Sequence, residues 1–384
     1  MSQNNFYDVA VIGAGVFGAW TALCLRRAGK RVALVDAYGP GNARASSGGE
    51  SRLIRMAYGA DELYTRWSMR SLEVWKEFFA QTGKPLFHQT GILWIANAKD
   101  PQAEASRETL KRVGVRHEIL NRSGLEARFP QIGFGDASWG IFEPESGVLL
   151  ARRVVAAVAE AAIAEGVDYF QEFVATPTGT GKIASVRTST GRDIHASEFI
   201  FACGPWLGKV FPDLLAQRIF VTRQEVYFFG VPAGDKRFAP PAMPGWLFQA
   251  DLTYGVPDLE SRGFKIALDS HGPAFDPDTD SRVPTAEGIA AMRKYLVERF
   301  PALATAPLVE ARVCQYENTS NGDFLVDRHP EFENVWLVGG GSGHGFKHGP
   351  AMGEYVTGRL TGTISVEERF SLLSKETMQR RTVY

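Results

Sequence analysis

The chain has 384 residues, 45% of them apolar and 22% charged, which is typical of a globular protein with a sizeable core. Its net charge of −1, from 42 basic and 43 acidic side chains, argues against recruitment by nucleic acid or by an acidic membrane surface. Charges and glycines interrupt every apolar run before it reaches the ~20 residues of a membrane span, and the composition of the first residues leads us to expect no signal peptide. Because the three cysteines are widely spaced and odd in number, we expect no disulfide framework and a cytoplasmic location.

The first predicted elements form a βαβ unit. Residues 9–12 are apolar and β-branched, as in a buried parallel strand, and the glycine-rich turn 13–18 follows at once. A helix is predicted over 19–27 and a second strand over 31–35, which ends in Asp36. This order of strand, glycine turn, helix and strand is typical of a dinucleotide-binding site.

Each glycine of the turn has a separate role. Gly13 allows the tight turn, Gly15 lets the backbone approach a pyrophosphate, and Gly18 permits close packing of the helix on the strand. The helix N-terminus offers N–H groups to the phosphates, and Asp36, 23 positions after Gly13, can accept hydrogen bonds from a ribose. The motif predicts a dinucleotide but does not distinguish FAD from NAD. The alternative is a glycine turn that only packs two elements together.

Apolar periodicity predicts further helices and strands along the chain. We expect helices over 63–81 and 151–165 and a helix-rich stretch after residue 96, with strands over 86–96, 198–202 and 335–338. Aromatic and apolar runs with turn breaks within 219–230 and 246–269 indicate an antiparallel sheet. The final strand leads into the glycine-rich loop 339–345 and a helix from about residue 350, so we expect the chain to return to its first domain.

Several motifs follow one another in order, at 48–59, 142–147, 202–206, 254–257, 263–265, 313–316, 327–330 and 343–347. Together with Asp36 they resemble the monomeric sarcosine oxidase family, which also contains N-methyltryptophan oxidase and pipecolate oxidase and belongs to the wider D-amino acid oxidase superfamily. The resemblance extends from about residue 8 to residue 361 without a large insertion. It implies that the dinucleotide is FAD.

The resemblance also implies a mixed α/β (α+β) fold. A discontinuous, Rossmann-type FAD-binding domain is expected to take residues 1–85, 150–218 and 313–384. The substrate domain, built on a mixed, largely antiparallel sheet, is expected to take residues 86–149 and 219–312.

Cys314 is the residue that could attach the cofactor to the protein. A lone cysteine is more often a small buried hydrophobe than a reactive group. The resemblance, however, places Cys314 where the family forms an 8α-S-cysteinyl bond to the flavin. Such a bond is chemically reasonable, because the oxidised ring acidifies its 8-methyl group and a thiolate can add there. The cofactor-binding residues that the resemblance implies are Gly13, Gly15, Gly18, Asp36, Ser46, Arg52, Cys314, Gly343, Gly345 and Lys347.

Lys265 stands in an apolar strand run. Its neighbours Phe264 and Ile266 point to the opposite face, so we expect the lysine in a cavity, the alternative being an exposed sheet edge. In the family this lysine lies at the flavin and promotes oxygen activation, because a fixed cation stabilises developing superoxide. Tyr254 matches a tyrosine that lines the family's substrate pocket.

Two cations match the pair that holds the substrate carboxylate in the family. Arg55 offers a planar fork that suits a carboxylate, and Lys347 adds a point charge. Arg52 matches the arginine close to the flavin ring, although most arginines are simply solvated. The resemblance therefore implies catalytic roles for Lys265, Arg52, His344 and Tyr254 and substrate-binding roles for Arg55, Lys347 and Asp269.

His344 lies in the glycine-rich loop before the last helix. Either the loop faces the flavin pyrimidine ring, where its N–H groups stabilise charge that collects on reduction, or His344 braces the loop. The chain departs from sarcosine oxidase at Gly48 and Asp269, where that enzyme has histidines. Because Asp269 can pair with a cationic amine, we hypothesise a substrate that is larger or more basic than sarcosine.

The predicted reaction is oxidation of the C–N bond of a secondary (N-methyl) or cyclic amino acid to an imine, which then hydrolyses to an aldehyde or ketone and an amine, with O₂ reduced to hydrogen peroxide. One alternative is a dehydrogenase that passes electrons to a protein or quinone acceptor. A non-catalytic flavoprotein is another, but it would be expected to lack Arg55, Lys265 or Lys347. Histidine and cysteine spacing predicts no metal site. We expect a monomer with no nucleic-acid or membrane partner.

Overall fold

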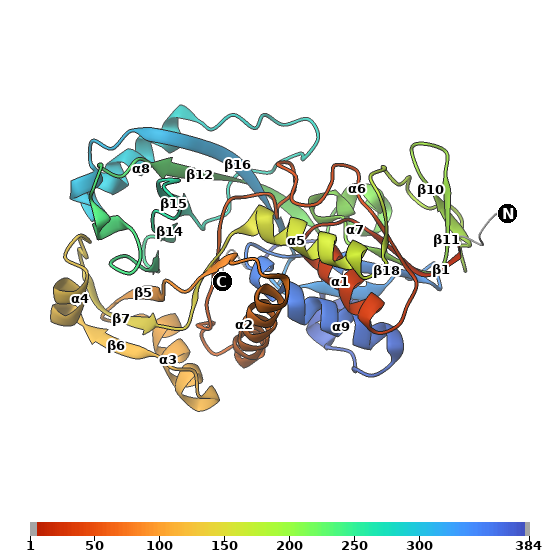
Figure 1. Cartoon of the computed structure of the whole chain (residues 1–384), viewed down its shortest axis with the longest axis horizontal. Coiled ribbons are helices and arrows are strands. Elements are labelled where there is room, and N and C mark those ends of the chain that lie inside the picture. The colour runs from red at the N-terminus through yellow and green to blue at the C-terminus, as the bar shows by residue number, and fades with distance from the viewer. Residues whose placement is uncertain (1–5, 381–384) are drawn as a thin grey trace.

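A seven-stranded sheet forms the core of one of the two lobes of the computed structural model, which describes residues 6–380 (Figure 1). Its strand order is β17-β18-β11-β1-β2-β9, with β10 paired to β11. The strands are β1 (Phe6–Ile12), β2 (Val32–Val35), β9 (Asp168–Phe170), β10 (Ser185–Arg187), β11 (Asp193–Phe201), β17 (Leu325–Arg328) and β18 (Val335–Gly339).

The centre of this sheet is parallel. β1 pairs in parallel with β11 on one side and β2 on the other, so Ile12 lies beside both Phe201 and Val35. β18 pairs in parallel with β11, while β10 and β17 are antiparallel. The strands β1, β2, β11 and β18 therefore end at one edge of the sheet, the edge at which open parallel sheets bind ligands.

Helices cover the parallel strands because their apolar side chains must be buried on both faces. α1 (Val16–Arg27) packs against α5 (Ala151–Ala164) and α9 (Gly349–Thr361), and α2 (Glu62–Thr82) packs against α9. The shared core includes the buried Trp20, Trp75 and Trp336. The remaining helices are α3 (Pro101–Val113), α4 (Arg122–Arg128), α6 (Leu207–Val210), α7 (Pro212–Leu215) and α8 (Ala286–Arg299).

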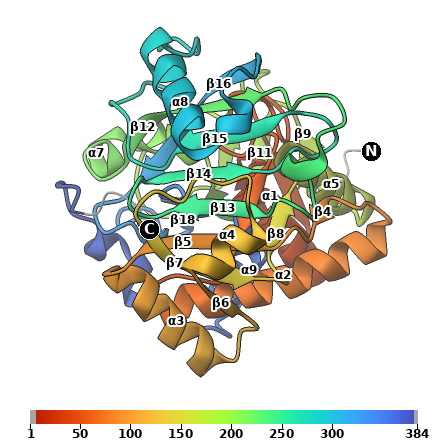
Figure 2. The same ribbon diagram turned by 90° about the vertical axis from the view of Figure 1, so that its left-hand side faces the viewer.

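The second lobe is built on an eight-stranded sheet with the order β16-β12-β15-β14-β13-β5-β7-β6 (Figure 2). Only the pair β13–β5 is parallel. The strands are β5 (Ile92–Asn97), β6 (Glu118–Asn121), β7 (Ala137–Glu143), β12 (Phe220–Phe229), β13 (Gly245–Phe248), β14 (Thr253–Val256), β15 (Phe264–Leu268) and β16 (Leu308–Asn318). Aromatic side chains such as Trp246, Phe264 and Phe300 fill the core under this sheet.

A small three-stranded sheet contributes Arg52 to the site. It has the order β3-β8-β4, from β3 (Arg52–Ile54), β8 (Gly147–Leu149) and β4 (Phe87–His88). Over residues 6–380, none of the helices combines the length and apolar character that crossing a bilayer requires.

The expected fold class is confirmed: a mixed fold with a Rossmann-type parallel unit and a second, largely antiparallel sheet. The expectation of a helix-rich stretch after residue 96 was incomplete, because β6 and β7 lie there between and after the helices. β16 was not predicted as a strand. The domain boundaries stay a prediction. β16 continues across the limit expected between residues 312 and 313.

Candidate active site

A large cavity, of about 290 Å³, opens at the edge where the parallel strands of the first sheet end. The glycine turn after β1, Asp36 after β2, Cys203 after β11 and Gly341 after β18 all line it. Aromatic side chains line it as well, namely Tyr38, Phe173, Trp206 and Phe346. Of the predicted cofactor residues, this cavity brings together Gly13, Gly15, Asp36, Ser46, Arg52, Gly343 and Gly345.

The glycine turn packs too tightly for side chains at two positions. Gly13 has φ +107°, and a Cβ there would lie 2.2 Å from the carbonyl oxygen of Ala202. A Cβ on Gly18 would lie 1.8 Å from the carbonyl oxygen of Gly13. Gly18 does not line the cavity, so its part is to let α1 approach the turn.

Asp36 holds the turn in place. Its Oδ2 accepts a hydrogen bond from the Ala14 N–H at 2.7 Å, and its Oδ1 accepts from the N–H groups of Tyr38 and Gly39. Sequence reasoning missed Ser47, whose Oγ accepts from the Val16 N–H at 3.1 Å and so caps the start of α1. The carboxylate of Asp36 therefore fixes the backbone of the turn in addition to lining the cavity.

Arg52 lies where three cavities meet. It lines the large cavity, a second cavity of about 70 Å³ and a third of about 20 Å³. Its guanidinium donates to the carbonyl oxygens of Ser46 at 2.7 Å and Ser51 at 2.8 Å, and to Cys314 Sγ at 3.4 Å. Cys314, on β16, lines the second and third cavities.

The second cavity contains the expected substrate-binding residues Arg55, Lys347 and Asp269, together with Tyr254 and His344. Lys347 was also expected at the cofactor, but it lines this second cavity and not the large one. Arg55 is buried between two rings, with its guanidinium carbon 4.7 Å from the centroid of Tyr58 and 4.8 Å from that of Trp94. Such cation–π contacts stabilise a buried cation.

Glu143 sets the position of Arg55, and sequence reasoning gave it no role. Its carboxylate accepts hydrogen bonds from the N–H groups of Met56 at 2.7 Å and Ala57 at 3.0 Å, and from Ser146 Oγ at 2.5 Å. Arg55 Nη1 in turn donates to the Ala57 carbonyl oxygen. The signal in the sequence was the motif at 142–147, which contains both Glu143 and Ser146.

Several buried ionisable groups of the second cavity have shifted pKa values. Burial and the nearby Arg55 guanidinium hold the pKa of Lys347 well below its usual range. Burial raises the pKa of Asp269, although the hydroxyl of Tyr316 donates to its Oδ1 at 2.9 Å. Tyr254 lines the same cavity, and burial raises its pKa to about 12, so its hydroxyl stays protonated at neutral pH.

Lys265 lines the third cavity and not the second, so it lies apart from Arg55 and Lys347. It is 1% exposed, which rules out the sheet-edge alternative, and its Nζ donates to the Ser51 carbonyl oxygen at 3.1 Å. Its ammonium nitrogen is 5.4 Å from the ring centroid of Tyr254. Burial, and next the positive charge of Arg52, lower the pKa of Lys265 to about 7.

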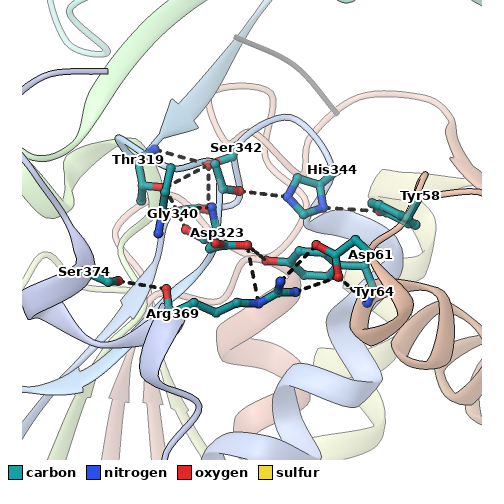
Figure 3. A network of polar contacts seen from close by, with 12 residues as sticks. Tyr58, Asp61, Tyr64, Thr319, Asp323, Gly340, Ser342, His344, Arg369 and Ser374 are labelled. Carbon is teal, nitrogen blue, oxygen red and sulfur yellow. Dashed lines mark hydrogen bonds and ion pairs between the residues drawn. The ribbon is translucent and has the colours of Figure 1, made fainter. Parts of the chain in front are cut away.

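His344 braces the glycine-rich loop, and it also lines the second cavity. Its Nε2 is 3.0 Å from the Gly322 carbonyl oxygen, which can only accept, so a neutral ring carries its hydrogen on Nε2. Its Nδ1 then accepts from the Tyr58 hydroxyl at 3.2 Å, and the ring stacks on Phe324. Figure 3 shows His344 between this loop and Tyr58.

The Tyr58 hydroxyl joins the predicted residues Lys347 and His344 to His348, and sequence reasoning had given neither Tyr58 nor His348 a role. Lys347 Nζ donates to it at 2.6 Å, and Nε2 of the fully buried His348 lies 2.8 Å away. Behind it, Arg369 pairs with Asp61 at 2.9 Å and Asp323 at 3.7 Å (Figure 3). This network fixes Lys347 and the loop to α2 and to the C-terminal segment.

Comparison with known proteins agrees with this arrangement. The family model described as FAD dependent oxidoreductase (DAO) matches residues 8–359. The chain is 31% identical over 401 residues to monomeric sarcosine oxidase of Arthrobacter sp. (strain TE1826), which covers 100% of both chains. It is 29% identical over 354 residues to N-methyl-L-tryptophan oxidase of Salmonella arizonae, covering 91% of this chain and 93% of the relative.

A solved structure has the same fold. L-proline dehydrogenase from P. horikoshii superposes with a TM-score of 0.82 at 20% identity and covers 95% of this chain and 96% of its own. The fold and the cavity define an oxidoreductase that binds a dinucleotide at a Rossmann-type edge. The chain belongs to the DAO family of FAD-dependent oxidoreductases.

The residues of the large cavity fit FAD. The glycine turn leaves the α1 N-terminus open to a diphosphate, and the cavity continues to aromatic side chains that suit flat rings. Over residues 6–380, no group of three or more His, Cys, Asp or Glu side chains could hold a metal ion.

Proposed function

We propose that the chain is an FAD-dependent amine oxidase that acts on the C–N bond of a secondary (N-methyl) or cyclic amino acid. The observation that carries this proposal is the pair of buried cations, Arg55 and Lys347, in a cavity that meets the large cavity at Arg52. A buried arginine and a buried lysine that line one cavity suit an anionic ligand group such as a carboxylate. A carboxylate bound there would orient the rest of an amino acid towards Arg52 and Cys314. The named relatives support an N-methyl amino acid as the substrate class.

The side chains of the second cavity suggest how the substrate is prepared. Bound FAD would supply a two-electron acceptor for the C–H bond next to the nitrogen. Arg55 and Lys347 hold the carboxylate, and Tyr254 and Tyr316 close the cavity around the amine. Asp269 lies on the same cavity and can accept a hydrogen bond from the nitrogen or from a second polar group. No side chain of the cavity is needed as a general base if the amine binds deprotonated.

The acceptor that we propose is O₂, which would be reduced to hydrogen peroxide. Lys265 supports this choice because it places a buried positive charge in a small separate cavity next to Arg52 and Cys314, away from the carboxylate-binding cations. A fixed cation stabilises negative charge as it develops on oxygen. The alternative, a dehydrogenase with a protein or quinone acceptor, has no comparable use for Lys265.

We further propose that the flavin is bound covalently through Cys314, that the chain acts as a monomer and that it works in the cytoplasm. The position of Cys314 beside Arg52, at the junction of the cavities, supports the covalent bond. The name of the sarcosine oxidase relatives supports the monomer. The three free cysteines suit a reducing compartment.

Arg55→Met is expected to raise the KM for an N-methyl or cyclic amino acid by about 10- to 100-fold, because the variant loses a charged hydrogen bond to the substrate carboxylate. The measurement is peroxide release as a function of substrate concentration. Methionine fills a similar volume between Tyr58 and Trp94, which limits the loss of packing. Arg66→Met, at an exposed arginine of α2, is the control and should leave KM unchanged. An unchanged KM in Arg55→Met would contradict the carboxylate role.

Asp269→Asn tests the preference for a larger or more basic substrate. We expect affinity for amino acids with a second amino group to fall by about 10-fold, while affinity for sarcosine stays the same, because the variant removes one charged hydrogen bond. Competitive inhibition constants for both classes would measure this. Equal affinities of wild type and variant for both classes would refute the hypothesis.

Lys265→Met is expected to slow reoxidation of the reduced flavin by O₂ by about 100-fold, the usual effect of losing one preorganised electrostatic group. In the wild type this rate should fall as pH rises through about 7, because Lys265 loses its proton there. Stopped-flow mixing of reduced holoenzyme with O₂ measures both effects. Lys294→Met, at an exposed position of α8, is the control. A Lys265→Met variant that reoxidises at the wild-type rate would favour the dehydrogenase.

Acid precipitation tests the covalent bond. In the wild type the yellow flavin should stay with the precipitated protein, and in Cys314→Ser it should pass into the supernatant. Cys203→Ser is a matched control, because Cys203 lines the large cavity but its sulfur contacts the Ile12 carbonyl oxygen and not Arg52. Flavin released from the wild type as well would exclude the covalent bond and leave the oxidase function open.

A further inference from the structure

Glu317 is a buried acid for which the proposed reaction has no use. It is the penultimate residue of β16 and lines the large cavity together with Cys203 and Gly341. Its side chain is buried, with 7% of the residue exposed. Within residues 6–380, its Oε1 has no hydrogen-bond partner. A buried carboxyl oxygen without a partner is costly and calls for a functional explanation.

The surroundings of Glu317 disfavour its charge. The backbone N–H groups of Gly340 and Gly341 donate to the carboxyl group. The titratable groups that face the same region are Cys203 and Asp36, and neither supplies a positive charge. The cations Arg52 and Lys209 line the same cavity, but Arg52 is bound to Ser46, Ser51 and Cys314, and Lys209 pairs with Asp276 and Asp278. Burial raises the pKa of Glu317 to about 7, against the effect of the two N–H groups.

The carboxyl group sits at the binding edge of the first sheet. Its Oε1 occupies the space beside Gly339, the last residue of β18, where a Cβ would lie only 2.4 Å away. Its Oε2 is 3.9 Å from the Cβ position of Gly204, which follows β11. At such an edge the glycine turn receives the diphosphate of a dinucleotide, and the atoms that follow towards the flavin are those of the ribitol chain. All of these parts present oxygen atoms.

We propose that Glu317 binds FAD as a neutral carboxylic acid and donates a hydrogen bond to an oxygen of the diphosphate–ribitol chain. An ionised carboxylate there would repel the diphosphate, whereas a protonated one supplies the donor that phosphate and hydroxyl oxygens accept. The nearby negative charge of the cofactor also favours the protonated form. The inference depends on FAD binding and is independent of which amine, if any, the chain oxidises.

A pH dependence of stability follows from this protonation. The native protein keeps a proton on Glu317 that the unfolded chain loses above the ordinary glutamate pKa of 4.5. The stability of the native state is therefore highest below that value and falls as pH rises towards about 7. Bound diphosphate extends this fall to higher pH, because it raises the pKa of the acid further. A glutamine at this position keeps an N–H donor and removes the titration.

The test compares purified holoenzymes of the wild type, Glu317→Gln, Glu317→Ala and Glu310→Gln. Glu310 lies on the same strand, pairs with Arg262 at 2.6 Å and does not line the large cavity, so its variant is a matched control. Three quantities are measured: flavin content, visible circular dichroism of the flavin, and the temperature at which flavin fluorescence rises on unfolding, from pH 5 to 8.5.

Between pH 5 and pH 8.5 we expect the unfolding temperature to fall in the wild type and in Glu310→Gln. The fall should be about 5 °C larger than the change in Glu317→Gln. Glu317→Gln should keep the wild-type flavin content and visible circular dichroism. Glu317→Ala should lose flavin or change the visible circular dichroism while its far-ultraviolet spectrum stays native.

Two results would overturn the proposal. One is a pH dependence in Glu317→Gln that is parallel to that of the wild type. The other is a Glu317→Ala variant of lower stability whose flavin content and visible circular dichroism match the wild type, since the acid would then be structural only. A wild-type chain purified without any flavin would instead overturn the cofactor assignment, and this inference with it.

Discussion

The contact between Arg52 and Cys314 is the constraint on which the rest of the site depends. Arg52 begins the short strand β3, which follows the loop beside the glycine turn, whereas Cys314 belongs to β16 of the second sheet. The guanidinium is held by the Ser46 and Ser51 carbonyl oxygens, so the contact fixes the two lobes at one point. The cofactor cavity, the cavity with the carboxylate-binding cations and the small Lys265 cavity all meet there.

Around that point the fold keeps several cations out of water, which is unfavourable unless other groups stabilise the charge. Arg55 is stabilised by two aromatic faces and by the Ala57 carbonyl oxygen. Lys347 has the Tyr58 hydroxyl and the His344 carbonyl oxygen, and Lys265 has the Ser51 carbonyl oxygen. These contacts hold each side chain in a fixed position next to one of the cavities.

Local sequence patterns were sufficient for much of the fold. The glycine turn, the strand before it and helix α2 each depend on residues close in sequence, and the expected helix over 63–81 became Glu62–Thr82. β16 escaped detection because charged residues such as Glu310 and Arg312 interrupt its apolar pattern. Its last half nevertheless alternates, with Val313, Gln315 and Glu317 buried on one face. That alternation was the available signal for Glu317.

The residues of the site were predictable where a motif contained them, and not otherwise. The motifs gave Arg55, Lys265 and Lys347, and the structure buries all three. Tyr58 and His348 are 290 positions apart, and no local pattern connects them. The same holds for the ion pairs of Arg369 with Asp61 and Asp323, which only the return of the chain to its first lobe brings together.

Anaerobic mixing of the purified holoenzyme with N-methyl and cyclic amino acids, followed by admission of air, tests the central claim most directly. We predict that at least one of these amino acids bleaches the flavin absorbance, that the same amine without its carboxylate does not, and that O₂ restores the absorbance with one hydrogen peroxide per flavin. Flavin that no amino acid of either class reduces would contradict the amine chemistry. Reduced flavin that stays bleached in air would instead identify a dehydrogenase.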